Sequence, residues 1–188
     1  MQVTLKKVRL AFPQLFEAER FKGSEGKPRF SASFIIERGG EAHKALEAAI
    51  KEVAAEAWKN KAPMMLDEFK GNSNKFCVSN GDTKGWDGAE GCVVLAAHRN
   101  EDQGRPLLLD GRKQPTTAAD AVLYSGCYVH AIVDIWAQTK DYPGVRCSLN
   151  GVMFAAEGEA FVGGGRATVD DFADLAADDT PWEDAALA

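Results

Sequence analysis

Aromatic and cationic side chains alternate with apolar ones along two neighbouring segments of this 188-residue chain. In residues 125–138 the alternation predicts a strand with Tyr128 and Trp136 on one face, because successive strand side chains point to opposite faces. After a turn at 140–144, residues 145–150 alternate again and place Arg146 on a second strand, so the two segments form a predicted hairpin. Rings that can stack on bases and cations that can pair with phosphates are the groups that bind single-stranded nucleic acid.

Further candidates of both kinds lie in segments that we predict to be loops. For phosphate contacts we nominate Lys27, Arg29, Lys75, Lys84, Arg99, Arg105, Arg112, Lys113 and Arg146. For base stacking we nominate Tyr128, Trp136 and Trp86, with Tyr124 and Tyr142 in reserve. The competing interpretation of each cation is an ordinary solvated charge, and that of a strand aromatic is core packing. Trp86 stands in a polar loop, which predicts an exposed ring.

The formal net charge of −6 looks unfavourable for a DNA-binding protein, but the acidic residues are unevenly distributed. Residues 167–188 contain seven acidic residues and no Lys or Arg, which leaves 21 acidic and 22 basic residues in the first 166. Those 166 residues are therefore near neutral, at +1, and can still carry a local basic stripe.

The acidic tail, residues 167–188, has too few large apolar residues to fold alone, so we predict that it is disordered. We hypothesise that its carboxylates imitate a nucleic-acid strand in the basic groove, with an aromatic ring in a base pocket, until DNA or a replication partner displaces it. A merely solubilising tail is the alternative. The regulatory or partner-binding candidates in the tail are Asp170, Asp171, Phe172, Asp174, Asp178, Asp179, Trp182, Glu183 and Asp184.

The elements that would position these groups are mostly strands. Alternation predicts strands at 8–12, ending at the turn of Pro13, and at 30–36, with further strands at 76–79, 92–98 and 107–110. Apolar residues three and four apart predict one helix over about 41–60 that packs on the sheet, with Trp58 in the core. Apart from the short strand at 76–79, we predict that residues 61–91 form long loops. We therefore expect a mainly β fold with one substantial helix, a single domain over residues 1–166, and a flexible joint at 157–165 before the tail.

Metal, disulfide and membrane interpretations find little support in the sequence. Four cysteines (Cys77, Cys92, Cys127 and Cys147) stand singly, without the close pairs that hold a metal, and predict reduced, partly buried thiols. We expect no cofactor. No apolar run approaches the roughly 18 residues of a membrane span, and the N-terminus does not resemble a signal peptide, so we expect a cytoplasmic protein.

Several short motifs, in their order and spacing, resemble a family of single-stranded-DNA-binding proteins of tailed phages, formerly catalogued as a domain of unknown function. The motifs are Val8–Pro13, Phe30–Ile36, Gly104–Pro106, Tyr124–His130, Pro143–Val145, Ser148–Val152, Gly158-Glu159, Gly163–Gly165 and Asp170–Phe172. The resemblance implies an OB-fold barrel with extra elements, DNA binding with little sequence preference, and a disordered acidic tail. Two departures are Gly151, where family members often have a second Asn after Leu-Asn, and the unusual Trp86 after the turn near Asp82.

The sequence thus predicts a non-enzymatic protein that binds and protects single-stranded DNA during phage replication, recombination or repair. Duplex DNA would bind more weakly, since stacking favours unpaired bases. Replication or recombination proteins would bind the tail, and the sequence leaves open whether the chain is a monomer, a homodimer or a filament. One alternative is a protein–protein adaptor of the replication machinery without its own DNA binding. Another is a metal-dependent nuclease, for which the only acidic cluster lies in the tail.

Overall fold

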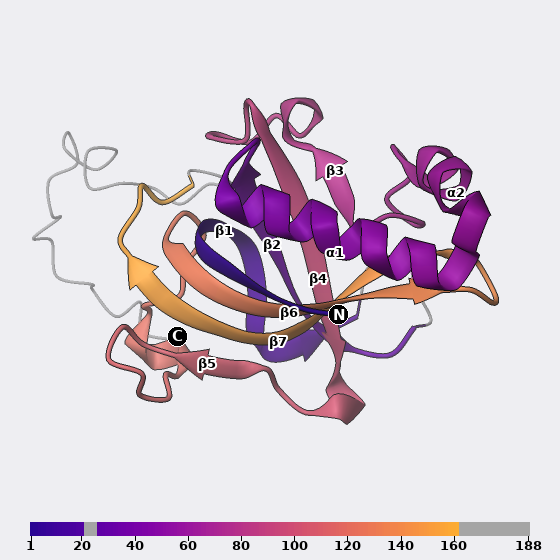
Figure 1. The fold of residues 1–188 in the computed structure, drawn as a ribbon. Coiled ribbons are helices and arrows are strands. Elements are labelled where there is room, and N and C mark those ends of the chain that lie inside the picture. Colours follow the sequence, from indigo (N-terminus) through magenta and orange to yellow (C-terminus); the bar gives the residue numbers. More distant parts are fainter. Residues whose placement is uncertain (21–25, 162–188) are drawn as a thin grey trace, which may run out of the picture.

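Seven strands form one sheet in the computed structural model of the chain, which describes residues 1–20 and 26–161. They are β1 (Gln2–Glu19), β2 (Arg29–Glu37), β3 (Val78–Asn80), β4 (Cys92–Asn100), β5 (Leu107–Leu109), β6 (Tyr128–Gln138) and β7 (Gly144–Ala156). Their order is β3-β4-β2-β1-β6-β7-β5, and an additional parallel pairing of His98 on β4 with Ser148 on β7 closes five of them into a barrel. The predicted mainly β, OB-like fold is confirmed (Figure 1).

The inner wall of the barrel follows from the alternation in β6. Cys127, just before the strand, and Val129, Ala131, Val133 and Ile135 are all 0% exposed, as the predicted apolar face requires. Residues from β1, β2, β4 and β7 complete this core, among them Leu5, Phe34, Leu95 and Leu149. The closure itself is narrow: β4 and β7 share the pair His98–Ser148, and beside it the backbone of Cys77 bridges the two strands, donating to the Val145 carbonyl and accepting from the Ala96 N–H.

The first strand is longer than its sequence predicts. Pro13 was expected to end it, yet β1 continues to Glu19, and its pairing with β2 shifts register between Ala11 and Gln14. A bulge of this kind absorbs a proline within a strand because the ladder hydrogen bond is interrupted there anyway. Phe12, immediately before Pro13, has a positive φ of 47°.

The helical region begins as predicted but extends further. Helix α1 (Glu41–Trp58) packs Leu46, Ala49 and Ile50 into the core and lies against β1, β2 and β6 (Figure 1). A 3-10 turn (η1, Lys59–Lys61) then leads into α2 (Ala62–Phe69), where a loop was predicted. Pro63 in its first turn favours a helix start, a signal that the loop interpretation missed. Trp58 is half-buried and packs edge-on against Phe69, with ring centroids 5.4 Å apart.

Short elements fill the remaining connections. They are the 3-10 turns η2 (Gly81–Thr83), η3 (Glu101–Gln103) and η4 (Ala118–Asp120). Strand β5 pairs in parallel with residues 151–153 of β7. The strand predicted at 76–79 is β3, which begins two residues later. Among the described helices, none combines the length and apolarity needed to cross a membrane. The predicted domain end at 166 and the acidic tail, 167–188, lie outside the described residues.

Candidate nucleic-acid interface

The predicted hairpin brings Trp136 and Arg146 directly opposite each other. They are Cα partners in the antiparallel ladder of β6 and β7, so their side chains lie on the same outer face of the barrel. The Trp136 side chain is 40% exposed, and its Nε1 donates a hydrogen bond to Ser148 Oγ at 3.0 Å. The ring is thus both accessible and fixed in orientation, as a stacking platform requires.

Three acceptors hold the guanidinium of Arg146. Its Nε donates to Gln138 Oε1 at 3.2 Å, one Nη donates to the Tyr142 carbonyl at 3.3 Å, and the other donates to the Asn74 carbonyl. None of these acceptors is a carboxylate, so the positive charge is positioned without being neutralised. A fixed cation loses less side-chain entropy when it meets a phosphate than a free one does.

Trp136 and Arg146 border a hollow of about 350 Å³, which we call the β4–β7 hollow. It joins β2, β4, β6, β7 and the segment before β3. Its lining residues are Arg29, Ser73, Cys77, Ala96, His98, Asn100, Gln103, Trp136, Gln138, Arg146, Cys147 and Ser148. Among the described residues this lining has two arginines and no Asp or Glu, so the hollow favours an anion. OB folds bind oligonucleotides over the second and third barrel strands, here β2 and β4, beside the loops that join strands one to two and four to five.

The floor of the β4–β7 hollow carries His98 and two thiols. Burial, followed by the neighbouring charges of Arg29 and Arg146, lowers the pKa of His98 to about 4, so its ring is neutral at pH 7. Its Nδ1 is buried and has no hydrogen-bond partner in the part of the chain that the structure describes. Burial raises the pKa of Cys77 to about 12 and that of Cys147 well above its ordinary value, so both thiols stay protonated, as predicted for free cysteines.

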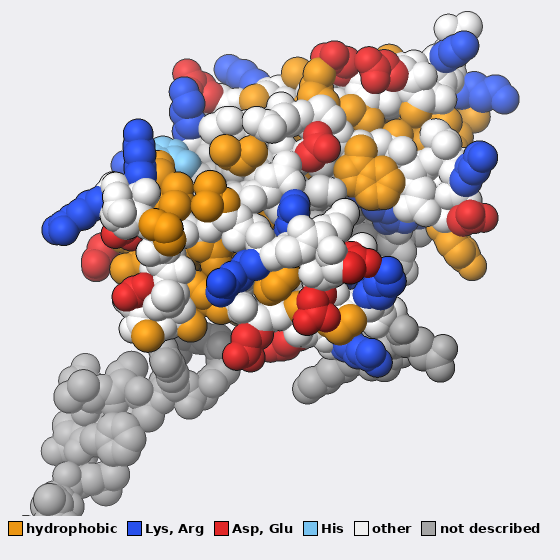
Figure 2. All heavy atoms as spheres, turned by 90° about the horizontal axis from the view of Figure 1, so that it is seen from below, with side chains coloured by type: hydrophobic (Ala, Val, Ile, Leu, Met, Phe, Trp, Pro, Cys, Tyr) orange, Lys and Arg blue, Asp and Glu red, His pale blue; other side chains and the backbone are white. Residues whose placement is uncertain are grey.

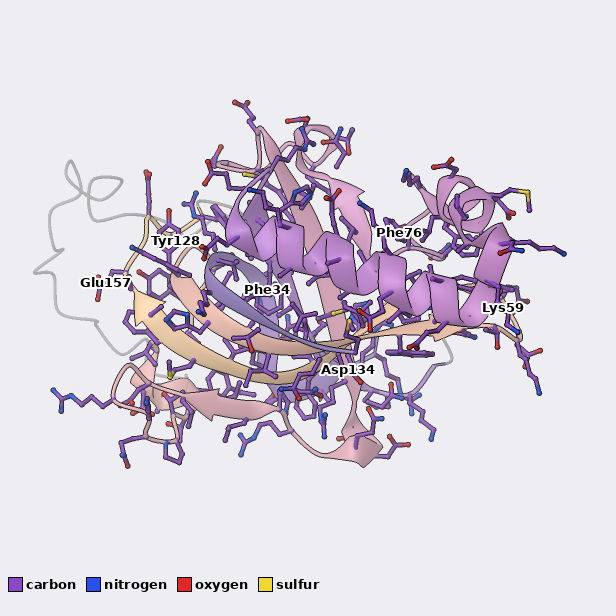
Figure 3. The ribbon with its side chains drawn as sticks, viewed as in Figure 1. Phe34, Lys59, Phe76, Tyr128, Asp134 and Glu157 are labelled. Atoms are coloured by element: carbon purple, nitrogen blue, oxygen red, sulfur yellow. The ribbon has the colours of Figure 1, made fainter. Side chains whose placement is uncertain are left out.

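Tyr128 does not share this hollow with Trp136. It lies at the other end of β6, near Glu157 and away from Asp134 (Figure 3). It lines a larger hollow, of about 810 Å³, between β1, the start of α1 and residues 88–92. The charged lining residues there are Lys6, Lys7, Arg9, Glu37, Glu41 and Glu90. We call it the α1 hollow. Its three acidic residues balance its three cations, so it attracts phosphates less than the β4–β7 hollow does.

The other nominated cations divide into paired and exposed ones. Lys27 Nζ lies 2.6 Å from an Asp102 carboxylate oxygen, and Lys75 Nζ lies 2.8 Å from one of Glu68. Arg105, Arg112 and Lys113 are exposed on the connections around β5. On the face that carries β5, Figure 2 shows Lys and Arg side chains scattered among acidic and hydrophobic ones, without a continuous basic patch.

Arg99 is used by the fold itself. Its guanidinium donates to the carbonyls of Gly104 at 2.8 Å and Gln103 at 2.9 Å, and to Asn150 Oδ1 at 3.1 Å. These bonds tie η3 and the end of β4 to β7. The structure therefore gives Arg99 a role in holding the wall of the barrel, and sequence reasoning had no means of seeing these partners.

Trp86 packs against the barrel and is not the exposed ring that its polar loop predicted. It is half-buried and meets Phe12 edge-on, with ring centroids 4.7 Å apart. Lys84 Nζ lies 5.5 Å from the Trp86 ring centroid. The reserve candidate Tyr124 donates its hydroxyl to the Gly158 carbonyl at 2.9 Å, whereas Tyr142 is 81% exposed beside the β4–β7 hollow.

Sequence reasoning missed the uncharged polar residues of the hollow, among them His98, Gln138 and Ser148. Gln138 and Ser148 could have been found, since both belong to the predicted hairpin and face the same side as Trp136. His98 gave no such signal, because it joins the hollow only through the parallel contact of β4 with β7, which are far apart in sequence. The tail candidates, Asp170 to Asp184, lie outside the described residues. Within 1–20 and 26–161, no three His, Cys, Asp or Glu side chains are placed to hold a metal ion.

Comparison with protein families gives a match across nearly the whole chain. Residues 1–182 match the family described as the single-stranded-DNA-binding protein of Enterobacter phage Enc34. Putative protein p50 of Acyrthosiphon pisum secondary endosymbiont phage 1 is 40% identical over 177 residues, which cover 93% of this chain and 94% of that protein.

Comparison with solved structures supports the same fold. The Enc34 single-stranded-DNA-binding protein in complex with single-stranded DNA has a TM-score of 0.65 at 19% identity, over 85% of this chain and 88% of that chain. The single-stranded-DNA-binding protein gp2.5 encoded by bacteriophage T7 has a TM-score of 0.53 at 14% identity, over 96% of this chain and 97% of that chain.

Proposed function

Because the chain belongs to the family of single-stranded-DNA-binding proteins represented by that of Enterobacter phage Enc34, we propose that it binds single-stranded DNA in the β4–β7 hollow. The observation that carries the proposal is the pairing of Trp136 with Arg146 beside Arg29, in a lining to which residues 1–20 and 26–161 contribute no Asp or Glu. A base stacks on the indole while its phosphates meet the two guanidiniums. None of these contacts reads a base edge, so binding is independent of sequence.

The protein acts by binding and covering unpaired strands during phage replication, recombination or repair, in the cytoplasm of the bacterial host, and not by catalysis. Duplex DNA binds more weakly, because its bases are stacked on one another and cannot reach Trp136. Tyr142, whose carbonyl accepts a hydrogen bond from Arg146 in the turn between β6 and β7, offers a second exposed ring. Lys27, in the connection from β1 to β2, is paired with Asp102 at 2.6 Å and therefore adds little to the positive potential there.

The acidic tail, residues 167–188, regulates this site in our proposal. Seven carboxylates without a single cation match the sign of the charge that the β4–β7 hollow attracts. The tail competes with DNA for the hollow and, when DNA displaces it, becomes available to replication or recombination proteins. Removing residues 167–188 should therefore tighten DNA binding at low salt. Unchanged affinity would reject competition and leave only partner recruitment or solubilisation.

Fluorescence anisotropy of a labelled oligothymidine and of a matched duplex, each at about 50 and 200 mM salt, tests the proposed function. We expect binding that prefers the single strand and weakens steeply with salt. Equal affinity for both would contradict the stacking role of Trp136. No binding at 50 mM salt, with or without the tail, would favour the adaptor that has no DNA binding of its own.

A further inference from the structure

An apolar groove lies on the outer face of the sheet, at the edge where β5 joins β7. Its floor is one row of cross-strand partners, namely Thr4 of β1, Ile132 of β6, Gly151 of β7 and Leu107 of β5. This hollow, which we call the β5 groove, has a volume of about 310 Å³. Leu107 is 58% exposed and Ile132 is 39% exposed. Apolar surface gathered in an exposed hollow marks a site of interaction.

Gly151 keeps the β5 groove open. A Cβ at this position would lie 3.3 Å from the carbonyl oxygen of Leu107 and 3.5 Å from its Cβ. A larger side chain would therefore occupy the space between β7 and β5. The pair two residues further along, Met153 and Leu109, supplies apolar walls. The groove is thus shaped to take large apolar side chains of a ligand.

The charges around the β5 groove are mainly positive. Lys6 belongs to its lining, to which the described residues contribute no Asp or Glu. The four residues on either side of β5 include three cations, Arg105, Arg112 and Lys113, and one acid, Asp110. The Asp110 carboxylate already accepts hydrogen bonds from two backbone N–H groups of its own turn, each at 2.8 Å. A ligand that combines apolar side chains with carboxylates therefore complements the groove.

The size of the groove favours a peptide segment over a second folded protein. Sites for small ligands begin at about 300 Å³, whereas a stable interface between two proteins covers about 800 Å² of each partner. A few side chains bind weakly by themselves, but a segment tethered close to its site has a high effective concentration there. The best occupant is thus a nearby segment of the same chain.

The described part of the chain ends close to the β5 groove. The ring centroid of its last residue, Phe161, lies 4.3 Å from the guanidinium carbon of Arg9. Arg9 is three residues from Lys6 along β1, or about 10 Å of strand. In the sequence beyond, Phe172 and Trp182 follow Phe161 by 11 and 21 residues, and flexible segments of these lengths span about 18 and 25 Å on average. Both aromatic residues can therefore reach the groove.

We propose that the β5 groove binds the apolar residues of the acidic tail, with Phe172 and Trp182 as the main contacts. Asp170 and Asp171 precede the first ring, and Glu183 and Asp184 follow the second. Binding of either ring brings these carboxylates to Lys6 and to the cations beside β5.

This contact rests on the proposed function and deepens it, because the groove and the DNA site are neighbours. Ile132 in the β5 groove and Trp136 in the β4–β7 hollow share one face of β6 and are four residues, or about 13 Å, apart. A tail held by its rings in the groove keeps its other carboxylates concentrated beside the β4–β7 hollow. The apolar contact thus strengthens the competition of the tail with DNA, at a place that DNA itself does not occupy.

The first test is a substitution that removes the apolar contact without changing the charge. Leu107→Gln alters the β5 groove and leaves the lining of the β4–β7 hollow intact. Its matched control is Met64→Gln, a residue 62% exposed on α2 and outside all three hollows. By anisotropy at about 50 mM salt, Leu107→Gln should bind oligothymidine about 3- to 10-fold more tightly than wild type, whereas Met64→Gln should not differ from it.

The reciprocal change lies in the tail of the full chain. Phe172→Gln combined with Trp182→Gln should give the same gain in affinity, and adding Leu107→Gln to that pair should give no more, because both changes remove one contact. Wild-type affinity of Leu107→Gln, or gains that simply add, would overturn the proposal.

The second test is made on the full chain without DNA. The photoreactive residue p-benzoylphenylalanine replaces Leu107, and the irradiated protein is digested and analysed by mass spectrometry. We expect a crosslink within one chain to a peptide from residues 167–188. A dimer crosslinked outside the tail would assign the groove to a second copy, and no crosslink to the tail would leave it to another protein; either result overturns the proposal.

The crosslink also separates this proposal from the proposed function. A protein that forms the crosslink to its tail but binds no oligothymidine contradicts the proposed function and supports the contact in the β5 groove. A protein that binds oligothymidine and forms no such crosslink contradicts the groove contact alone.

Discussion

Trp136 and Arg146 face each other across the β6–β7 ladder, and the indole Nε1 of Trp136 is fixed by Ser148 Oγ at 3.0 Å. One residue pair therefore supplies both kinds of contact that an unpaired strand needs. Because ladder partners have Cβ atoms only about 5 Å apart, a nucleotide can place its base and phosphate on the two side chains at once.

Replacing Trp136 tests the stacking contact. Trp136→Leu keeps an apolar side chain but removes the ring, and stacking contributes about 1–3 kcal/mol per base, so affinity for oligothymidine should fall about 5- to 140-fold. Trp136→Phe, which retains a smaller ring, should recover a large part of the loss. A titration in which Leu and Phe bind equally well would show that no base stacks here.

The two arginines should set the salt dependence. Arg146→Gln and Arg29→Gln each remove one phosphate contact, and the slope of log affinity against log salt should decrease by about 0.7 for each. Arg112→Gln, at an exposed arginine near β5 and outside the lining of the β4–β7 hollow, removes the same charge and serves as the matched control. If the Arg112 variant lost as much slope as the other two, the charge of the whole protein and not this hollow would govern binding.

The sequence predicted the hairpin because both of its strands alternate strictly, and alternation fixes which side chains share a face. It therefore identified Trp136 and Arg146 and the apolar inner wall, but could not tell that Tyr128 lies in a different hollow. That separation follows from the length of β6, since eight residues of strand span about 27 Å. His98 and Arg29 reach the site through strand pairings between distant segments, which a local pattern does not encode.

Arg99 provides a contrasting case, in which a nominated phosphate contact also holds parts of the fold together through its hydrogen bonds to Gly104, Gln103 and Asn150. Hydrogen bonds from a charged donor contribute about 1.5–3 kcal/mol, and Arg99→Gln should lower the free energy of unfolding by about that amount in urea titrations. The exposed neighbour Arg105→Gln should change it by less than about 0.5 kcal/mol. An Arg99 variant of unchanged stability and strongly weakened DNA binding would instead restore the interpretation of Arg99 as a phosphate contact.

Gly144 keeps the turn of the hairpin close to the segment before β3. A Cβ at this position would collide with the backbone carbonyl of Lys75, next to the Asn74 carbonyl that holds Arg146. Gly144→Ala should therefore cost about 1–3 kcal/mol of stability, as overpacking does, and also weaken DNA binding by displacing Arg146. At Gly111 a Cβ would lie 3.5 Å from the Phe154 side chain, an ordinary contact, so Gly111→Ala is the control. Wild-type stability and affinity in Gly144→Ala would show that this close approach is not needed.

The central claim is that single-stranded DNA binds in the β4–β7 hollow, and photocrosslinking tests it most directly. An oligothymidine containing 5-iododeoxyuridine, irradiated in the complex and digested, reports which aromatic side chain lies against a base. We predict that the crosslinked peptide contains Trp136, and that Trp136→Leu abolishes this crosslink. Crosslinks at Tyr128 in the α1 hollow, with none at Trp136, would contradict the account and move the DNA to the other end of β6.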